Sequence, residues 1–429
     1  MPAAVARLTT PIKRGVVTTI QTQRIGNLPA DHSLDLLNFF IADVQTGFGP
    51  FIAVYLTTRT WSPQQIGEAL SAGSLIAILA QVPSGAFIDA IRRKRLAGVI
   101  ALASVGLSAV MLALFPTRLP VFGAEGLHGL ASCLLVPSIA AITLSRVGRD
   151  NLGERLGRNA RFSALGSTIG AGLMGLMGTY WSAQSVFWCA ALFTIPGMIA
   201  IGMLPPRHET EPRPAKLGVK EGAKTAASES WRVLLDRKLI IFAFCVALFF
   251  LSNAAMLPLA AAALTGPRGM SANLVVAACI VVPQLMVAAL SPFMGRLAER
   301  RGRRTVLLLG FAALPLRGLL LSVLISPAGV IAAQALDGVG GAVLGVMLPL
   351  VAADVTRGTN RFNLCLGLFG LAAGLGATVS TTLGGLLATH LGNRAAFLGL
   401  AAAGAAAMAL VAFALPETRA ATTSPTPGS

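Results

Sequence analysis

Long apolar segments recur along almost the whole chain, and they restrict what it can fold into. Of its 429 residues, 55% are hydrophobic and 12% are charged. A helix needs about 20 residues to cross a hydrocarbon core of ~30 Å. Twelve segments are long enough: 34–57, 65–88, 96–116, 119–144, 161–180, 184–204, 239–264, 272–294, 305–326, 328–353, 363–389 and 394–415. The sequence therefore predicts an all-α membrane protein with twelve transmembrane helices.

Basic residues are distributed unevenly among the connections between these segments. If the amino terminus lies inside, 29 of the 34 Lys and Arg residues fall in cytoplasmic connections and tails, and only Arg59, Arg118, Arg268 and Arg394 fall outside. Cytoplasmic loops carry such an excess in membrane proteins. Both termini are predicted to be cytoplasmic, in an inner membrane. The net charge of +17 then reflects topology, and no nucleic-acid partner is expected.

The chain reads as one unit written twice. Two six-helix blocks end alike, at Leu204-Pro205 and Leu415-Pro416, and residues 39–43 (FFIAD) correspond to residues 249–253 (FFLSN). Repeated halves related by an axis along the membrane normal are common in secondary transporters. The predicted organisation is a cytoplasmic tail (1–33) without a cleaved signal peptide, a six-helix bundle (34–204), a cytoplasmic linker (205–238), a second six-helix bundle (239–415) and a second tail (416–429).

One connection in each half carries a glycine, an acid and then a run of basic residues. The stretches are 85–95 (GAFIDAIRRKR) and 295–304 (GRLAERRGRR). A glycine at a helix end allows close helix contact, an acid can pair with a helix N-terminus, and arginines stay in the cytoplasm. These residues predict a latch at the inner membrane face, in which Glu299 and the arginines after it pair across the bundles. The candidate latch residues are Gly85, Asp89, Arg93, Gly295, Glu299, Arg300, Gly302 and Arg303.

The pattern resembles the signature of the major facilitator superfamily, glycine-x-leucine-alanine-aspartate-arginine-x-glycine-arginine-arginine, which follows the second and eighth membrane helices. The second copy matches with Glu299 in place of the aspartate. The first has Ala90 for the arginine and Arg92 for the second glycine, so its latch is expected to be looser. The resemblance implies two six-helix bundles that alternate access to a midplane site, with helices one, four, seven and ten lining the cavity.

Within that family the chain resembles the drug-efflux branch, with two departures. Ala171 follows Gly170 where drug/proton antiporters carry a glycine-proline signature in helix five, and Glu125 stands where these exporters usually place an arginine. Any proton relay is therefore expected to use other residues than in those antiporters.

A few ionisable residues fall deep within the apolar segments. Such groups are costly in the membrane interior and are functional candidates. The deep set is Asp43, Glu125, His128, Arg317 and Asp337, and Asn253 is the counterpart of Asp43 in the second half. Helical spacing places Glu125 and His128 on one face of helix four, predicted to oppose the Asp337 face of helix ten. They are interpreted as proton-coupling groups or, alternatively, as fixed hydrogen-bond partners between helices.

Two further features have alternative interpretations. Arg317 either neutralises Asp337 from the next helix or meets an anionic substrate. In helix one, Gly47, Gly49 and Pro50 predict a kink, because proline removes a backbone donor; the kink is either a hinge or a static bend.

Missing motifs restrict the energy source. The sequence has no glycine-rich phosphate loop, no His-Glu-x-x-His and no Cys-x-x-Cys. We expect no metal, no cofactor and no enzymatic activity, with a proton gradient as the energy source. The favoured function is proton-coupled export of a small, partly apolar compound by a monomer in the lipid bilayer. The alternatives are proton-coupled uptake or efflux of a small organic or inorganic anion and, third, a transporter-like membrane sensor.

Overall fold

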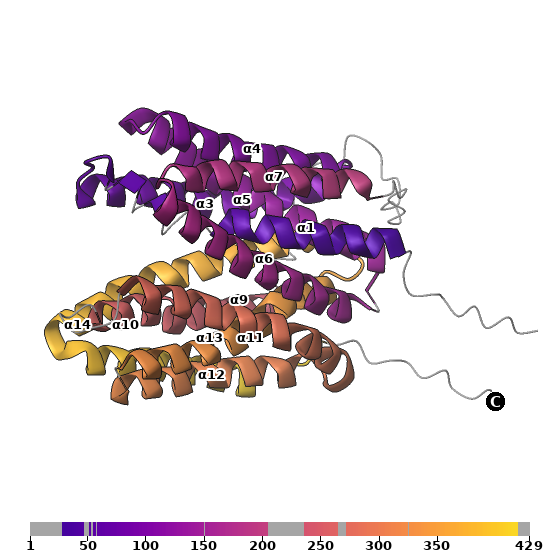
Figure 1. Ribbon diagram of the computed structural model, residues 1–429. Coiled ribbons are helices and arrows are strands. Elements are labelled where there is room, and N and C mark those ends of the chain that lie inside the picture. Colours follow the sequence, from indigo (N-terminus) through magenta and orange to yellow (C-terminus); the bar gives the residue numbers. More distant parts are fainter. Residues whose placement is uncertain are drawn as a thin grey trace, which may run out of the picture.

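The computed structural model describes residues 28–46, 51–52, 55–56, 58–149, 151–204, 236–264, 272–324 and 326–418, without the side chains at 28–31, 43–46, 63–64, 179, 261–264, 272–279 and 327. Within these ranges all regular structure is helical. Figure 1 shows two layers of long helices lying side by side, the first half of the chain in one and the second half in the other. The predicted all-α class is confirmed.

The helices follow the predicted segments in order. Those of the first half are α1 (Leu28–Thr46), α3 (Pro63–Ala90), α4 (Lys94–Leu114), α5 (Arg118–Val147), α6 (Leu152–Tyr180) and α7 (Ser185–Met203). Those of the second half are α9 (Arg237–Asn253), α10 (Met256–Leu264), α11 (Ala272–Arg301), α12 (Arg303–Val323), α13 (Pro327–Val355) and α14 (Phe362–Phe413). Among the described residues, nine helices are long and apolar enough to cross a membrane. The count of twelve stays a prediction.

Several boundaries differ from the predicted ones. The last two predicted segments both fall within α14. This element is broken at Gly392 (φ 84°, ψ 163°), where the chain turns back on itself at the left of Figure 1. The predicted segment 239–264 is divided into α9 and α10. Helix α6 begins at Leu152 rather than at 161. Its first turns are polar, so a search for apolar segments does not detect them. The predicted linker lies outside the described residues up to 235; Asp236 caps the start of α9 by accepting from Lys238 N (2.7 Å).

Local sequence signals define some helix starts. Ser62 Oγ accepts a hydrogen bond from Gln65 N, and Gln65 Oε1 accepts one from Ser62 N, so a capping box begins α3. Ser326 likewise accepts from Gly329 N at the start of α13. Proline follows both serines, and its fixed φ suits the first helical turn.

The same arginine contact closes each half. Arg95, from α4, donates from Nη2 to the Ile201 and Gly202 carbonyls (3.0 Å each) at the end of α7. Arg304, at the corresponding place in α12, donates to the Ala412 carbonyl at the end of α14. The last carbonyls of a helix have no partner within it and attract cations. The final basic residue of each signature therefore joins the third helix of its half to the sixth.

Among the described residues, the two halves share a buried hydrophobic cluster toward one end. We define the basic end as the end that carries residues 91–93 and Gly302. Close to it, Leu152 and Leu156 of α6 belong to one buried cluster with Met294 and Ala298 of α11, so the two halves share a core. Toward the opposite end, one cluster contains Tyr55 and Phe187 of the first half, and a separate one contains Met256 and Phe397 of the second half. The halves are thus packed together at the basic end.

A buried charge cluster ties α1 to α6 in the first half. The Asp35 side chain is 4% exposed and pairs with Arg155 (2.7 Å) and with Arg158. Arg155 Nε also donates to Asn159 Oδ1 (2.9 Å), and Asn159 Nδ2 donates to Thr143 Oγ1 (3.0 Å). Each buried charge thereby has charged or polar partners, which a low-dielectric interior requires.

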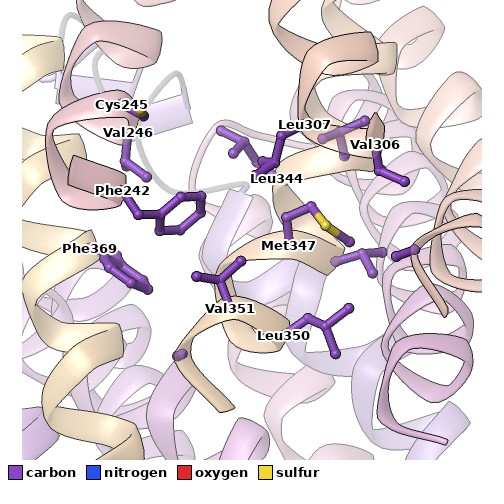
Figure 2. Close-up of a cluster of buried hydrophobic side chains, with 14 of the residues drawn as sticks. Phe242, Cys245, Val246, Val306, Leu307, Leu344, Met347, Leu350, Val351 and Phe369 are labelled. Atoms are coloured by element: carbon purple, nitrogen blue, oxygen red, sulfur yellow. The ribbon is translucent and has the colours of Figure 1, made fainter. Parts of the chain in front are cut away.

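The second half has apolar side chains at the corresponding positions. Residues 210 places after Asp35, Arg155 and Asn159 are Cys245, Cys365 and Phe369, all buried. Figure 2 shows Cys245 and Phe369 among apolar neighbours, and the rings of Phe369 and Phe242 lie 4.9 Å apart. The repeated fold thus tolerates either a paired charge cluster or an apolar core at the same place.

We expect Asp35→Leu to destabilise the protein strongly, since it leaves the buried Arg155 without its carboxylate. Breaking a buried pair costs about 3–5 kcal/mol. The measurement is the thermal unfolding midpoint in detergent. The matched control is Glu68→Gln, because Glu68 pairs with Arg118 at 2.8 Å with both side chains exposed (38% and 65%), and such pairs contribute about 1 kcal/mol or less. Equal midpoints for the two variants would contradict the prediction.

Candidate functional site

The first latch acid, Asp89, caps a helix of the opposite half. Its Oδ1 accepts from Asn363 N (3.0 Å) and Asn363 Nδ2 (2.8 Å), and its Oδ2 accepts from Leu364 N (2.8 Å). Asn363 and Leu364 lie in the first turn of α14. Backbone N–H groups there have no partner within the helix, and the helix dipole favours a negative charge. Asp89, at the end of α3, therefore joins the two halves at the basic end.

The second latch acid repeats this contact in the other direction. Glu299, near the end of α11, accepts at Oε1 from Gly153 N (2.9 Å) in the first turn of α6. Glu299 follows Asp89 by 210 residues, and Asn363 follows Gly153 by the same interval. The duplication seen in the sequence is therefore also a duplication of contacts across the two halves.

The glycines of the latch allow backbone to meet backbone. A Cβ atom at Gly85 would collide with the carbonyl oxygen of Asn363, and one at Gly295 would collide with that of Gly153. One turn further along, a Cβ at Gly157 would lie 2.5 Å from the Ser291 carbonyl oxygen. The predicted close approach of helices at these glycines is present.

The arginine contacts correct one prediction. Arg303 Nε donates to Asp354 Oδ2 (2.9 Å), and its Nη1 donates to Glu299 Oε2 (3.2 Å). Both partners belong to its own half, so Arg303 does not pair across the bundles; it holds Glu299, which does. The side chains of Arg93 and Arg300 are exposed.

The expectation of a looser first latch is wrong in hydrogen-bond terms, because Asp89 accepts three bonds from the opposite half and Glu299 accepts one. The missing glycine has a geometric reason. A single residue, Gly302 at φ 92°, connects α11 to α12, whereas three residues, 91–93, connect α3 to α4. The longer connection turns without a positive φ at Arg92.

A polar network holds Arg317 inside the second half. The Arg317 side chain is 1% exposed; its Nη1 donates to Asp337 Oδ1 (2.8 Å) and to Asn253 Oδ1, and its Nη2 donates to Gln334 Oε1 (2.9 Å). Asn253 Nδ2 also donates to Asp337 Oδ1 (2.9 Å). The ion pair expected between Arg317 and Asp337 is thus present. Removing the Asp337 carboxylate would leave the buried Arg317 guanidinium without its counter-charge, which is costly.

Glu125, in the first half, has a different environment from the residues around Arg317. It is 6% exposed, and its Oε1 is buried without a hydrogen-bond partner among the described residues. The carboxyl lies against Gly73 of α3, where an added Cβ would stand 3.0 Å from Oε2. His128 Nε2 lies 3.5 Å from Ser132 Oγ on the same helix. Glu125 therefore points toward α3, and the proposed opposition of its face to that of Asp337 stays a prediction.

Some predicted site residues lie outside the described residues. They are Gly47, Gly49 and Pro50, together with the side chain of Asp43, whose backbone is in α1.

Sequence reasoning missed several charged contacts. Asp35 is not among the predicted site residues, because the stretch before 161, which carries its partners, is predicted to be a connection. The recurrence of Arg155, Arg158 and Asn159 at helical spacing could have indicated a polar face directed at a buried acid. Asp354 was overlooked because it lies at the end of an apolar helix.

These observations define a class of protein. Two repeated helical halves meet at one end through reciprocal helix caps, and several of their helices can span a membrane while holding buried ionisable groups. Secondary transporters are built in this way.

Comparison with known proteins identifies the family. A sequence model of the Major Facilitator Superfamily matches residues 34–283 and 254–429. Two proteins of Mycobacterium tuberculosis, from strains CDC 1551 and H37Rv, are each 34% identical over 388 residues, covering 90% of this chain and 93% of their own; both are described as uncharacterized MFS-type transporters. The chain belongs to the major facilitator superfamily. It is a multi-pass membrane transporter and not an enzyme.

We expect Asp89→Asn and Glu299→Gln each to increase opening at the basic end, because each removes a charge from a helix N-terminus. The dipole contribution is about 0.3–1 kcal/mol, so the open fraction should rise by a few fold. Asp89→Asn should have the larger effect, since Asp89 accepts more bonds from the opposite half. The readout is the accessibility of introduced cysteines at the two ends. If accessibility is unchanged in both variants, the prediction is wrong and these acids do not control opening of the basic end.

The network around Arg317 predicts a charge-pair rescue. Asp337→Asn should lower stability by about 3–5 kcal/mol, because it leaves Arg317 buried and uncompensated. Arg317→Met combined with Asp337→Leu should recover most of that loss, since both charges are then absent. Thermal unfolding of the single and double variants measures this. A double variant less stable than Asp337→Asn would contradict the ion-pair explanation.

Proposed function

We propose that this transporter exports a small, partly apolar compound in exchange for protons across the cytoplasmic membrane, as in the drug-efflux branch of its family. It works as a monomer, without a cofactor, and the proton gradient supplies the energy. The excess of Lys and Arg in one set of connections supports a cytoplasmic basic end with both termini inside. Closure at that end corresponds to an outward-facing state, in which a midplane site communicates with the exterior.

The observation that carries the proton coupling is the environment of Glu125. Its Oε1 is buried without a hydrogen-bond partner in the described part of the chain, and Glu125 forms no ion pair with the described residues. A buried carboxylate without compensation is costly, whereas a protonated carboxyl is tolerated. Glu125 is therefore suited to carry a proton in this state and to release it when its surroundings change.

The alternative substrate, a small anion, has less support. That hypothesis uses Arg317 to meet the negative charge of the substrate. Arg317 is bound to Asp337, Asn253 and Gln334, so its charge is already balanced inside the second half. For this reason we favour a neutral or cationic compound with apolar surface over an anion.

Proteoliposomes with an imposed pH gradient test this function, screened over lipophilic cations, weak acids and oxyanions. Glu125→Gln should reach the membrane and bind substrate, yet lose most gradient-driven transport while it retains energy-independent exchange. Asp43→Asn, at the position of Asn253 in the repeat, is the parallel variant for the other candidate acid. If both variants transport at the wild-type rate along the gradient, proton coupling through these residues is wrong; counterflow without any pH dependence would exclude proton coupling altogether.

A further inference from the structure

The segment after α14 reaches back to the start of α12. Glu417 Oε1 accepts from Arg303 N (2.9 Å), and its Oε2 accepts from Arg304 N (3.2 Å). Arg303 and Arg304 are the first two residues of α12, so their N–H groups have no acceptor within the helix. Gly302, the N-cap position, has no side chain that could supply one. Glu417 therefore caps α12 from a distant part of the chain.

The place of this carboxylate depends on the glycine before α12. Gly302 has φ 92°, which disfavours any side chain. A Cβ atom there would also strike the Glu417 carboxylate, with Cδ only 2.9 Å away. Glycine at 302 thus serves two purposes: it makes the one-residue turn, and it leaves room for Glu417.

The first half lacks both parts of this arrangement. Arg92 stands where the second half has Gly302, and the N-cap of α4, Arg93, makes no side-chain cap hydrogen bond. In sequence, Leu415-Pro416 is followed by Glu417, whereas Leu204-Pro205 is followed by Pro206, which has no acceptor side chain. Among the described residues, the carboxylate cap is therefore found only in the half that contains Glu299.

The cap is linked to the latch through one residue. Arg303, whose backbone N–H donates to Glu417, donates from its side chain to the Ala298 carbonyl (2.8 Å) and to Glu299 Oε2 (3.2 Å). The other oxygen of Glu299 accepts from Gly153 N in the opposite half. A continuous chain of hydrogen bonds thus runs from the segment after α14 to α6.

We propose that Glu417 is a positioning residue for the latch. By fixing the first turn of α12, it orients Arg303, which holds Glu299 toward Gly153 and so stabilises closure of the basic end. The carboxyl-terminal segment thereby controls the balance between the closed and open forms of that end. The proposal relies on the proposed function only in treating closure as one state of a transport cycle.

The test uses the full chain, without its native cysteines, carrying Ser291→Cys as a reporter. Ser291 is 0% exposed and its backbone lies against Gly157 of α6, so a small charged thiol reagent should reach the introduced cysteine only when the basic end opens. Glu417→Ala should raise the labelling rate by roughly fivefold, the scale of a lost helix cap, and Glu417→Gln should raise it less. Glu68→Gln removes an exposed carboxylate at the opposite end, far from the latch, and should leave the rate unchanged.

A second variant tests whether faster labelling results from loss of the Glu417 cap or from a general loss of stability. Gly302→Ala should raise labelling as Glu417→Ala does, because its Cβ displaces the carboxylate, and the double variant should label no faster than the faster single variant. Independent, multiplicative effects would overturn the link between the two residues, as would an unchanged rate in folded Glu417→Ala. If Glu417→Ala does not fold, Glu417→Gln decides the question. No transport is measured, so failure of proton-coupled export would not affect the result.

Discussion

The structure depends on how the N-terminal turns of α6 and α14 are satisfied where the halves meet. Their first backbone N–H groups have no acceptor inside the helix, and each turn faces the other half. Asp89 and Glu299 supply the acceptors, each from the end of a helix in the opposite half. Closure of the basic end thus satisfies groups that would otherwise need water, and opening it exposes them again. One acidic residue in each repeat thereby joins the two halves at this end.

The two halves have kept this contact while their interiors diverged. The first half buries Asp35 with two arginines where the second has cysteines and Phe369. The second half pairs the buried Arg317 with Asp337, whereas the first half buries Glu125, whose Oε1 has no hydrogen-bond partner among the described residues. Paired charges hold helices in fixed relation, because removing one partner leaves the other charge buried and uncompensated. The asymmetry therefore distinguishes paired charges that join helices from Glu125, whose Oε1 has no hydrogen-bond partner among the described residues.

Much of the fold could be predicted from sequence, because apolar segments and basic connections report directly on membrane helices. The latch acids and their glycines were also predictable from the repeat, and so was the contact between Arg317 and Asp337. The partners of those acids were not, since backbone N–H groups leave no trace in the residue pattern. The polar start of α6 and the cap from Glu417 were missed for a related reason: a search for apolar runs ends where the helix leaves the hydrocarbon, and a cap between distant segments has no local spacing.

The glycine contacts between the halves have a mechanical consequence. At Gly85 and Gly295 the helices meet through backbone atoms, with no side chain interposed on the glycine side. Interlocked side chains must change rotamer before two surfaces can part, and each change adds to the barrier. Bare backbone has no rotamers to change. At these contacts the helices can separate without rotamer changes. The hydrogen bonds of the capping acids therefore set the resistance to motion there.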